Sequence, residues 1–181
     1  MGLNVGYLTS NKTSSGDENF TPFYAVDPIL EFLPKDKVIW CPFDKPWSAF
    51  VQKLVGGGWN VVCSHIEEGK DFFTFQPEHF DIIVSNPPFS KKDKVIKRLY
   101  ELNKPFAILL PIQALQSKTR FNFWTQGLEL LCFNERIGFH TGDNYERTAE
   151  GNHFASAYFC RNILPERLVL RKLNKYQQKL K

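Results

Sequence analysis

The chain has 181 residues, of which 43% are hydrophobic and 15% aromatic, and its formal net charge is +4. This length and apolar content favour one domain with a sizeable core and exclude a disordered chain, while the mild positive charge is compatible with nucleic-acid binding without requiring it. No apolar run approaches the roughly 20 residues that span a bilayer, so we expect no membrane association.

The chain begins with a polar segment, residues 1–19, that we interpret as a flexible arm. Because this segment has no hydrophobic stretch, it does not resemble a secretory signal, and a cytoplasmic location is expected. After it, Thr21 is a plausible N-cap and Pro22 a good first residue for a helix that ends near Pro34.

A β-α-β unit follows. An apolar strand at 38–41 ends at Pro42, a helix with apolar spacing covers 47–55, and Gly56–Gly58 separates that helix from a second strand at 59–63. The short crossover favours parallel strands.

The second half of the chain continues this alternation. It predicts a strand at 80–85, a helix at 91–102, a strand at 106–110, a helix at 117–124, and strands at 128–133 and 154–160. The last two could pair antiparallel. The polar loop between them, 138–152, is long enough to suggest a functional role.

The cysteines predict neither a metal site nor disulfides. No two of them have C-x-x-C spacing, and each lies in or beside an apolar run, so buried reduced thiols are expected. They are Cys41, Cys63, Cys132 and Cys160.

The stretch from Asp81 to Phe89 combines a buried strand with an abrupt polar end. Ile-Ile-Val-Ser at 82–85 is typical of an inner parallel strand, and Pro87 and Pro88 cannot donate to a sheet ladder. Asn86 is therefore expected at the carboxyl edge of the sheet, where open α/β sheets bind ligands.

This loop suits activation of an exocyclic amine on a base, which is a weak nucleophile because its lone pair is delocalised into the ring. The side-chain oxygen of Asn86 and the carbonyl of Pro87 can accept its two hydrogens and favour a pyramidal nitrogen, with Pro88 fixing the carbonyl. Phe89 would stack on the base. We interpret these four residues as catalytic; the alternative is a proline-rich turn that only ends the strand.

The run Phe-Asp-Ile-Ile-Val-Ser-Asn-Pro-Pro-Phe at 80–89 resembles motif IV of S-adenosylmethionine-dependent class I methyltransferases that act on amino nitrogens, chiefly N6-adenine enzymes. The resemblance covers most of residues 20–160. It implies an α/β, Rossmann-like sheet that is mostly parallel, with an antiparallel last strand and helices on both faces. It also implies S-adenosylmethionine as cofactor. The resulting division is a methyltransferase domain at 20–163 and a basic tail at 164–181.

The same resemblance assigns a cofactor-binding role to two earlier segments. Phe20, Thr21 and Pro22 resemble motif X, which helps enclose the methionine end of the cofactor, although an ordinary helix start is an equal alternative. Cys41 and Pro42 lie at the position of motif I. The family has a glycine-rich loop there, whereas this chain has no glycine between Pro42 and Ala49, so Asp44 is assigned to the methionine ammonium.

Two further segments resemble motifs II and III. At the end of the second strand, His65 or Glu67 could take the ribose hydroxyls, and a surface role for His65 is the alternative. Asp71 and Phe72 resemble the acid and ring that contact the cofactor adenine, and core packing is the alternative for Phe72.

The expected function is methylation of the N6 amine of adenine in nucleic acid, with DNA favoured over RNA. Other amino nitrogens remain open, namely guanine N2 in RNA, cytosine N4 and protein glutamine, as does an inactive fold that binds nucleic acid. Lys91, Lys92 and Lys94 could contact phosphates. Since no separate target-recognition region is evident, a short target context, a partner protein or a homodimer is expected.

Overall fold

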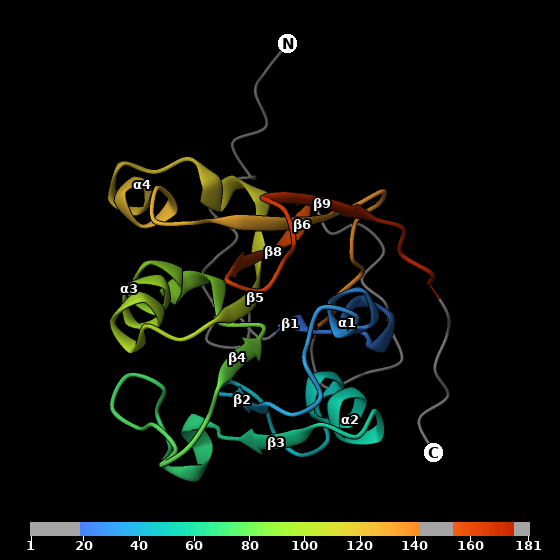
Figure 1. Ribbon diagram of the computed structural model, residues 1–181, viewed down its shortest axis with the longest axis vertical. Coiled ribbons are helices and arrows are strands. Elements are labelled where there is room, and N and C mark those ends of the chain that lie inside the picture. The colour runs from blue at the N-terminus through green and yellow to red at the C-terminus, as the bar shows by residue number, and fades with distance from the viewer. Residues whose placement is uncertain (1–18, 142–153, 176–181) are drawn as a thin grey trace.

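The computed structural model describes residues 19–141 and 154–175 (Figure 1). The arm at 1–18, most of the predicted 138–152 loop and residues 176–181 of the predicted tail lie outside the described residues.

The central element is a seven-stranded sheet in the order β3-β2-β4-β5-β8-β6-β9. β8 runs antiparallel to both of its neighbours, and all other pairs are parallel. The strands are β2 (Val38–Cys41), β3 (Asn60–Cys63), β4 (Ile82–Ser85), β5 (Phe106–Pro111), β6 (Glu129–Phe133), β8 (Ser156–Arg161) and β9 (Leu168–Arg171). A separate antiparallel pair joins β1 (Asn19–Phe20) to β7 (His140–Thr141).

Helices cover both faces of the sheet (Figure 1). Ile39 and Cys41 of β2 pack into one core cluster with α1 (Phe23–Leu30) and α2 (Ala49–Gly56). Trp40, between them, faces a second cluster with α3 (Lys92–Leu102) and α4 (Lys118–Trp124). Successive side chains of a strand point to opposite faces, so a strand buried on both faces shows this division. The α/β class and the mostly parallel sheet are confirmed, and β8 pairs antiparallel with β6 as expected. The expectation that the last strand is antiparallel is wrong, because β9 follows β8 and is parallel to β6.

Two predicted helix starts lie too early. Thr21 is not the N-cap of α1, because Pro22 has an extended backbone (ψ 150°) and itself precedes the first helical residue, Phe23. The second helix begins at Ala49, not at residue 47, and Trp47 remains 47% exposed in the preceding turn.

The sheet continues into the segment that the sequence separates as a basic tail. β9 pairs in parallel with β6, and Leu164, Val169 and Leu173 around it are buried against the α1 side of the core. Of the four β9 residues only Val169 is buried, and the charged residues on both sides of the strand hide it in the sequence.

The turn between β8 and β9 depends on one carboxylate. Glu129 accepts hydrogen bonds from the backbone N–H groups of Asn162 (2.9 Å), Ile163 (2.9 Å) and Leu164 (2.8 Å). Asn162 has a positive φ of 56°, so the turn is not an intrinsically favoured conformation.

Replacing Glu129 by alanine should therefore lower the free energy of unfolding by about 3 kcal/mol, because three donors lose a charged acceptor. Urea denaturation measures this. Glu135→Ala, which removes an exposed ion pair with Lys175 (2.8 Å), is the matched control and should cost about 0.5 kcal/mol. Equal losses for the two variants would contradict the role given to Glu129.

Candidate active site at the carboxyl edge of the sheet

The loops after β2 and β4 lie side by side at the carboxyl edge of the sheet. The chain leaves β2 for β3 on one side, and it later returns to form β4 on the other side. This is a topological switch point, the place where open α/β sheets form a ligand-binding crevice. The Asn86 loop and the Asp44 loop therefore meet at this position.

A hydrogen bond ties the two loops together. The hydroxyl of Ser85, the last residue of β4, donates to Oδ2 of Asp44 at 2.5 Å. Asp44 is only 7% exposed. Its burial raises its pKa from 3.8 to about 6, although the Ser85 hydrogen bond acts in the opposite direction. The hydrogen bond to Asp44 thus does not offset the cost of burying its negative charge. A cation bound nearby would stabilise the ionised carboxylate.

Asn86 follows Ser85 directly, so β4 fixes its position beside Asp44. The residue is half-buried, and its Oδ1 atom is shielded from solvent. Pro87 is buried, and the carbonyl of Pro88 accepts from the N–H of Lys91 at 3.1 Å, which begins a short 3-10 turn at Phe89–Lys91. The proline pair therefore sits between a buried strand and a hydrogen-bonded turn.

The Phe89 ring is held by two other rings. Its centroid lies 6.0 Å from that of Phe139 and 5.5 Å from that of Phe154, both in edge-to-face orientation. Such pairs contribute about 0.5–1.5 kcal/mol beyond the area that they bury. Phe139 and Phe154 lie on either side of the 140–153 segment in the sequence, so Phe89 connects the Asn-Pro-Pro loop to both ends of that segment.

Phe20 reaches the same edge through the β1–β7 pair. It lies opposite His140 in the register, and its ring centroid is 5.7 Å from that of Trp47 in the loop after β2. Thr21 and Pro22 follow it into α1. Cys41 ends β2 with a thiol whose pKa is raised by burial, and Pro42 beside it is buried.

The predicted ribose and adenine contacts have partners within the chain. Nδ1 of His65 accepts from the N–H of Glu67 at 3.3 Å and caps the 3-10 turn at Ile66–Glu68. Glu67 forms a 2.6 Å ion pair with Lys45, which links the loops after β2 and β3.

The third segment forms a tight turn. Oδ1 of Asp71 accepts from the N–H of Phe73 at 3.0 Å. Phe72 is 2% exposed and packs in the core between Trp40 (5.4 Å) and Phe43 (4.9 Å). Its ring therefore belongs to the α3 side of the core.

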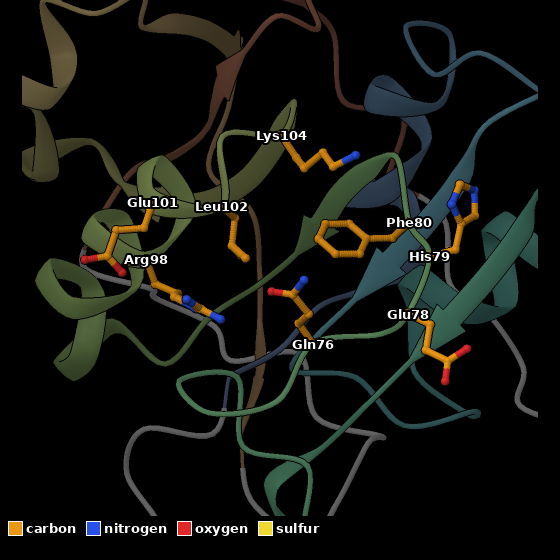
Figure 2. Close-up of a pocket in the computed structure, with 8 residues that line it drawn as sticks. All are labelled: Gln76, Glu78, His79, Phe80, Arg98, Glu101, Leu102 and Lys104. Atoms are coloured by element: carbon orange, nitrogen blue, oxygen red, sulfur yellow. The ribbon is translucent and has the colours of Figure 1, made fainter.

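A cavity of about 450 Å³ lies elsewhere, at the amino edge of the sheet (Figure 2). Its wall includes Phe80, just before β4, Lys104, just before β5, and Arg98 of α3. It contains none of the residues predicted for catalysis or cofactor binding, so it is separate from the switch-point edge.

Sequence reasoning missed Ser85, Phe139 and Phe154. The sequence predicts Ser85 only as a strand residue, although a hydroxyl directly before Asn86 at a strand end is a usable signal. Phe139 and Phe154 carried a weaker signal, namely an aromatic residue at each end of the long polar loop.

Within the described residues, no helix is long and apolar enough to cross a membrane. Comparison of the chain with protein-family models gives no match, and comparison with curated proteins gives none either.

Proposed function

We propose that this chain is an S-adenosylmethionine-dependent methyltransferase that acts on an exocyclic amine, with the N6 amine of adenine in DNA as the favoured acceptor. The observation that carries the proposal is the placement of Asn86-Pro87-Pro88-Phe89 directly after β4, next to the buried Asp44 carboxylate. An amine-accepting loop and a cation-accepting group share one edge of the sheet.

The residues at this edge fit the proposed cofactor. Asp44 is the group suited to its ammonium, because a cation would offset the burial that raises the Asp44 pKa to about 6. Phe20 and Trp47 offer apolar surface at the same edge. The cofactor, when bound, supplies an electrophilic methyl group on a sulfonium.

The chain's own contribution is positioning. The Asn86 side-chain oxygen and the Pro87 carbonyl accept the two amine hydrogens. The strand before Asn86 and the two prolines restrict the backbone that carries both acceptors, so little reorganisation is needed. No strong base is required, since the nitrogen can release its proton after accepting the methyl group. A duplex substrate would have to flip the target base out of the stack.

Nucleic acid is the proposed acceptor because exposed lysines follow the loop. Lys91 and Lys94 are exposed on the turn and helix next to Phe89, where they can approach phosphates. The other acceptors are guanine N2, cytosine N4 and protein glutamine, which present the same kind of planar amine.

Two measurements test the proposal. Calorimetry should detect binding of S-adenosylmethionine, and Asp44→Ala should abolish that binding. If wild-type protein shows no binding at millimolar cofactor, the proposed methyltransferase activity is refuted, and an inactive nucleic-acid-binding fold is the alternative. Labelled cofactor with DNA, RNA or protein, followed by digestion and mass analysis, should then give N6-methyladenine from DNA. Methylguanine, N4-methylcytosine or methylglutamine as the sole product would overturn the choice of adenine.

A further inference from the structure

The outer edge of β9 has the features of a strand-pairing surface. β9 ends the sheet, and among residues 19–141 and 154–175 no strand pairs with its outer side (Figure 1). Exposed edges of this kind readily accept another strand, and proteins usually shield them with prolines, charges or bulges. The four residues of β9 contain no proline, and Arg171 is its one charged residue.

The hydrogen bonds to β6 show which backbone groups point outward. The N–H of Leu130 donates to the carbonyl of Arg167, and the N–H of Asn134 donates to the carbonyl of Arg171. In a parallel pair, alternate residues face the neighbouring strand. Residues 167, 169 and 171 therefore face β6, and the N–H and C=O groups of Leu168 and Leu170 point away from the sheet.

The side chains of these two residues are also exposed. Leu168 is 55% and Leu170 67% exposed, whereas Val169 between them is buried against the α1 side of the core. Alternation places both leucines on the opposite face of the sheet from Val169. The edge therefore offers outward backbone groups together with two neighbouring apolar side chains.

We propose that this edge pairs with a second copy of the chain, β9 against β9 antiparallel, about a two-fold axis at Val169. In this register Leu168 faces Leu170 of the partner subunit, and the reverse pair forms on the other side of the axis. The backbone N–H and C=O groups of Leu168 and Leu170 point outward, so each Leu168–Leu170 pair across the axis is a hydrogen-bonded pair of an antiparallel ladder. The surface is self-complementary, as a two-fold interface requires.

The charges beside β9 favour the same register. Glu166 precedes the strand and Lys172 follows it, both are exposed, and neither forms an ion pair within the described part of the chain. About an axis at Val169, Glu166 lies opposite the partner subunit's Lys172, at both ends of the interface. Arg167 faces the partner subunit's Arg171, whose charge is already compensated by a 2.6 Å ion pair with Glu31.

This dimer joins two sheets into one and does not depend on the proposed methyl transfer. β8 is antiparallel to both β5 and β6, so β5 and β6 run in the same direction. Since β4 is parallel to β5 and β9 is parallel to β6, β9 also runs in the same direction as β4. The two copies of β4 consequently run in opposite directions, and the two Asn86 loops open at opposite edges of the joined sheet.

Sedimentation from about 1 to 500 µM tests the proposal, since a short strand interface corresponds to micromolar affinity. The mass of the wild-type chain should rise from 21.0 kDa toward twice that value. Leu170→Pro should remain monomeric but folded, because the N–H that it removes points away from β6. Val55→Lys, at a 57% exposed site on α2, is the control and should dimerise like wild type.

A charge exchange tests the register. Glu166→Lys alone and Lys172→Glu alone should each weaken dimerisation at least tenfold, and the double variant should restore it. A wild-type chain that stays monomeric throughout, or dimers unaffected by Leu170→Pro, would overturn the proposal. Dimers that both single variants weaken but the double variant fails to restore would refute the register about Val169.

Discussion

Replacing Asn86 by alanine should slow methyl transfer about 100- to 1000-fold, the usual effect of deleting one preorganised polar contact to a reacting group. Alanine removes the side-chain oxygen that accepts an amine hydrogen, and the Pro87 carbonyl then remains as the only acceptor of the pair. Binding of S-adenosylmethionine should be nearly unchanged, since the group assigned to the cofactor is Asp44. Single-turnover kinetics and calorimetry on the same preparation measure the two effects separately.

Asn122→Ala is the matched control for this variant. Asn122 is exposed on α4, far along the chain from the loop, so the same substitution there should leave both transfer and cofactor binding unchanged. Full activity in Asn86→Ala would show that the amide is not an acceptor. Loss of cofactor binding together with activity would show instead that Asn86 shapes the cofactor site.

Replacing Asp44 by asparagine should stabilise the fold above pH 6 while destroying cofactor binding. Burial raises the pKa of Asp44 from 3.8 to about 6, so the folded chain holds this proton more tightly than the unfolded chain. Stability from this group is fully present below about pH 4 and is lost as pH rises through about 6. Asparagine keeps an oxygen that can accept from Ser85 but cannot ionise, so it avoids that loss.

The gain at pH 8 should reach about 3 kcal/mol, which is two pKa units at 1.36 kcal/mol each, or about 6–10 °C in Tm. At pH 4 the two proteins should melt at nearly the same temperature. Thermal denaturation between pH 4 and 8 measures the difference. Asp36→Asn, at an exposed carboxylate, should track wild type, and a constant gap between Asp44→Asn and wild type at every pH would contradict the burial of an ionisable group.

Elements with strong hydrophobic patterns were predicted well from the sequence. The strand at 38–41 agrees with β2, and the helix at 91–102 differs from α3 by one residue, because Val95, Ile96 and Leu99 form a buried stripe. The strand predicted at 80–85 is observed as β4, which begins two residues later, at Ile82. The N–H of Val38 donates to the Asp81 carboxylate at 2.9 Å, so a side chain takes the place of a backbone acceptor at this end of the strand.

The candidate site was predictable only where its residues are adjacent in sequence. The Asn86 loop is a continuous motif, and its place at a strand end follows from the prolines. The Asp44–Ser85 hydrogen bond joins residues that are 41 positions apart in the sequence, and Phe89 is separated from Phe139 and Phe154 by even more positions. Such contacts depend on strand order, which no local pattern encodes. Phe72 illustrates the limit, since its ring suits a cofactor and a core equally until Trp40 and Phe43 are placed around it.

The position of β8 has a consequence for the order in which the chain is made. β5 and β6 follow each other in sequence but are separated in the sheet by β8, which emerges later from the ribosome. Until residue 161 is available, β5 presents a wholly apolar open edge, and β6 has no strand of the sheet to join. Nascent chains paused in this interval expose a template for intermolecular strand pairing and are natural clients for chaperones that bind extended apolar segments.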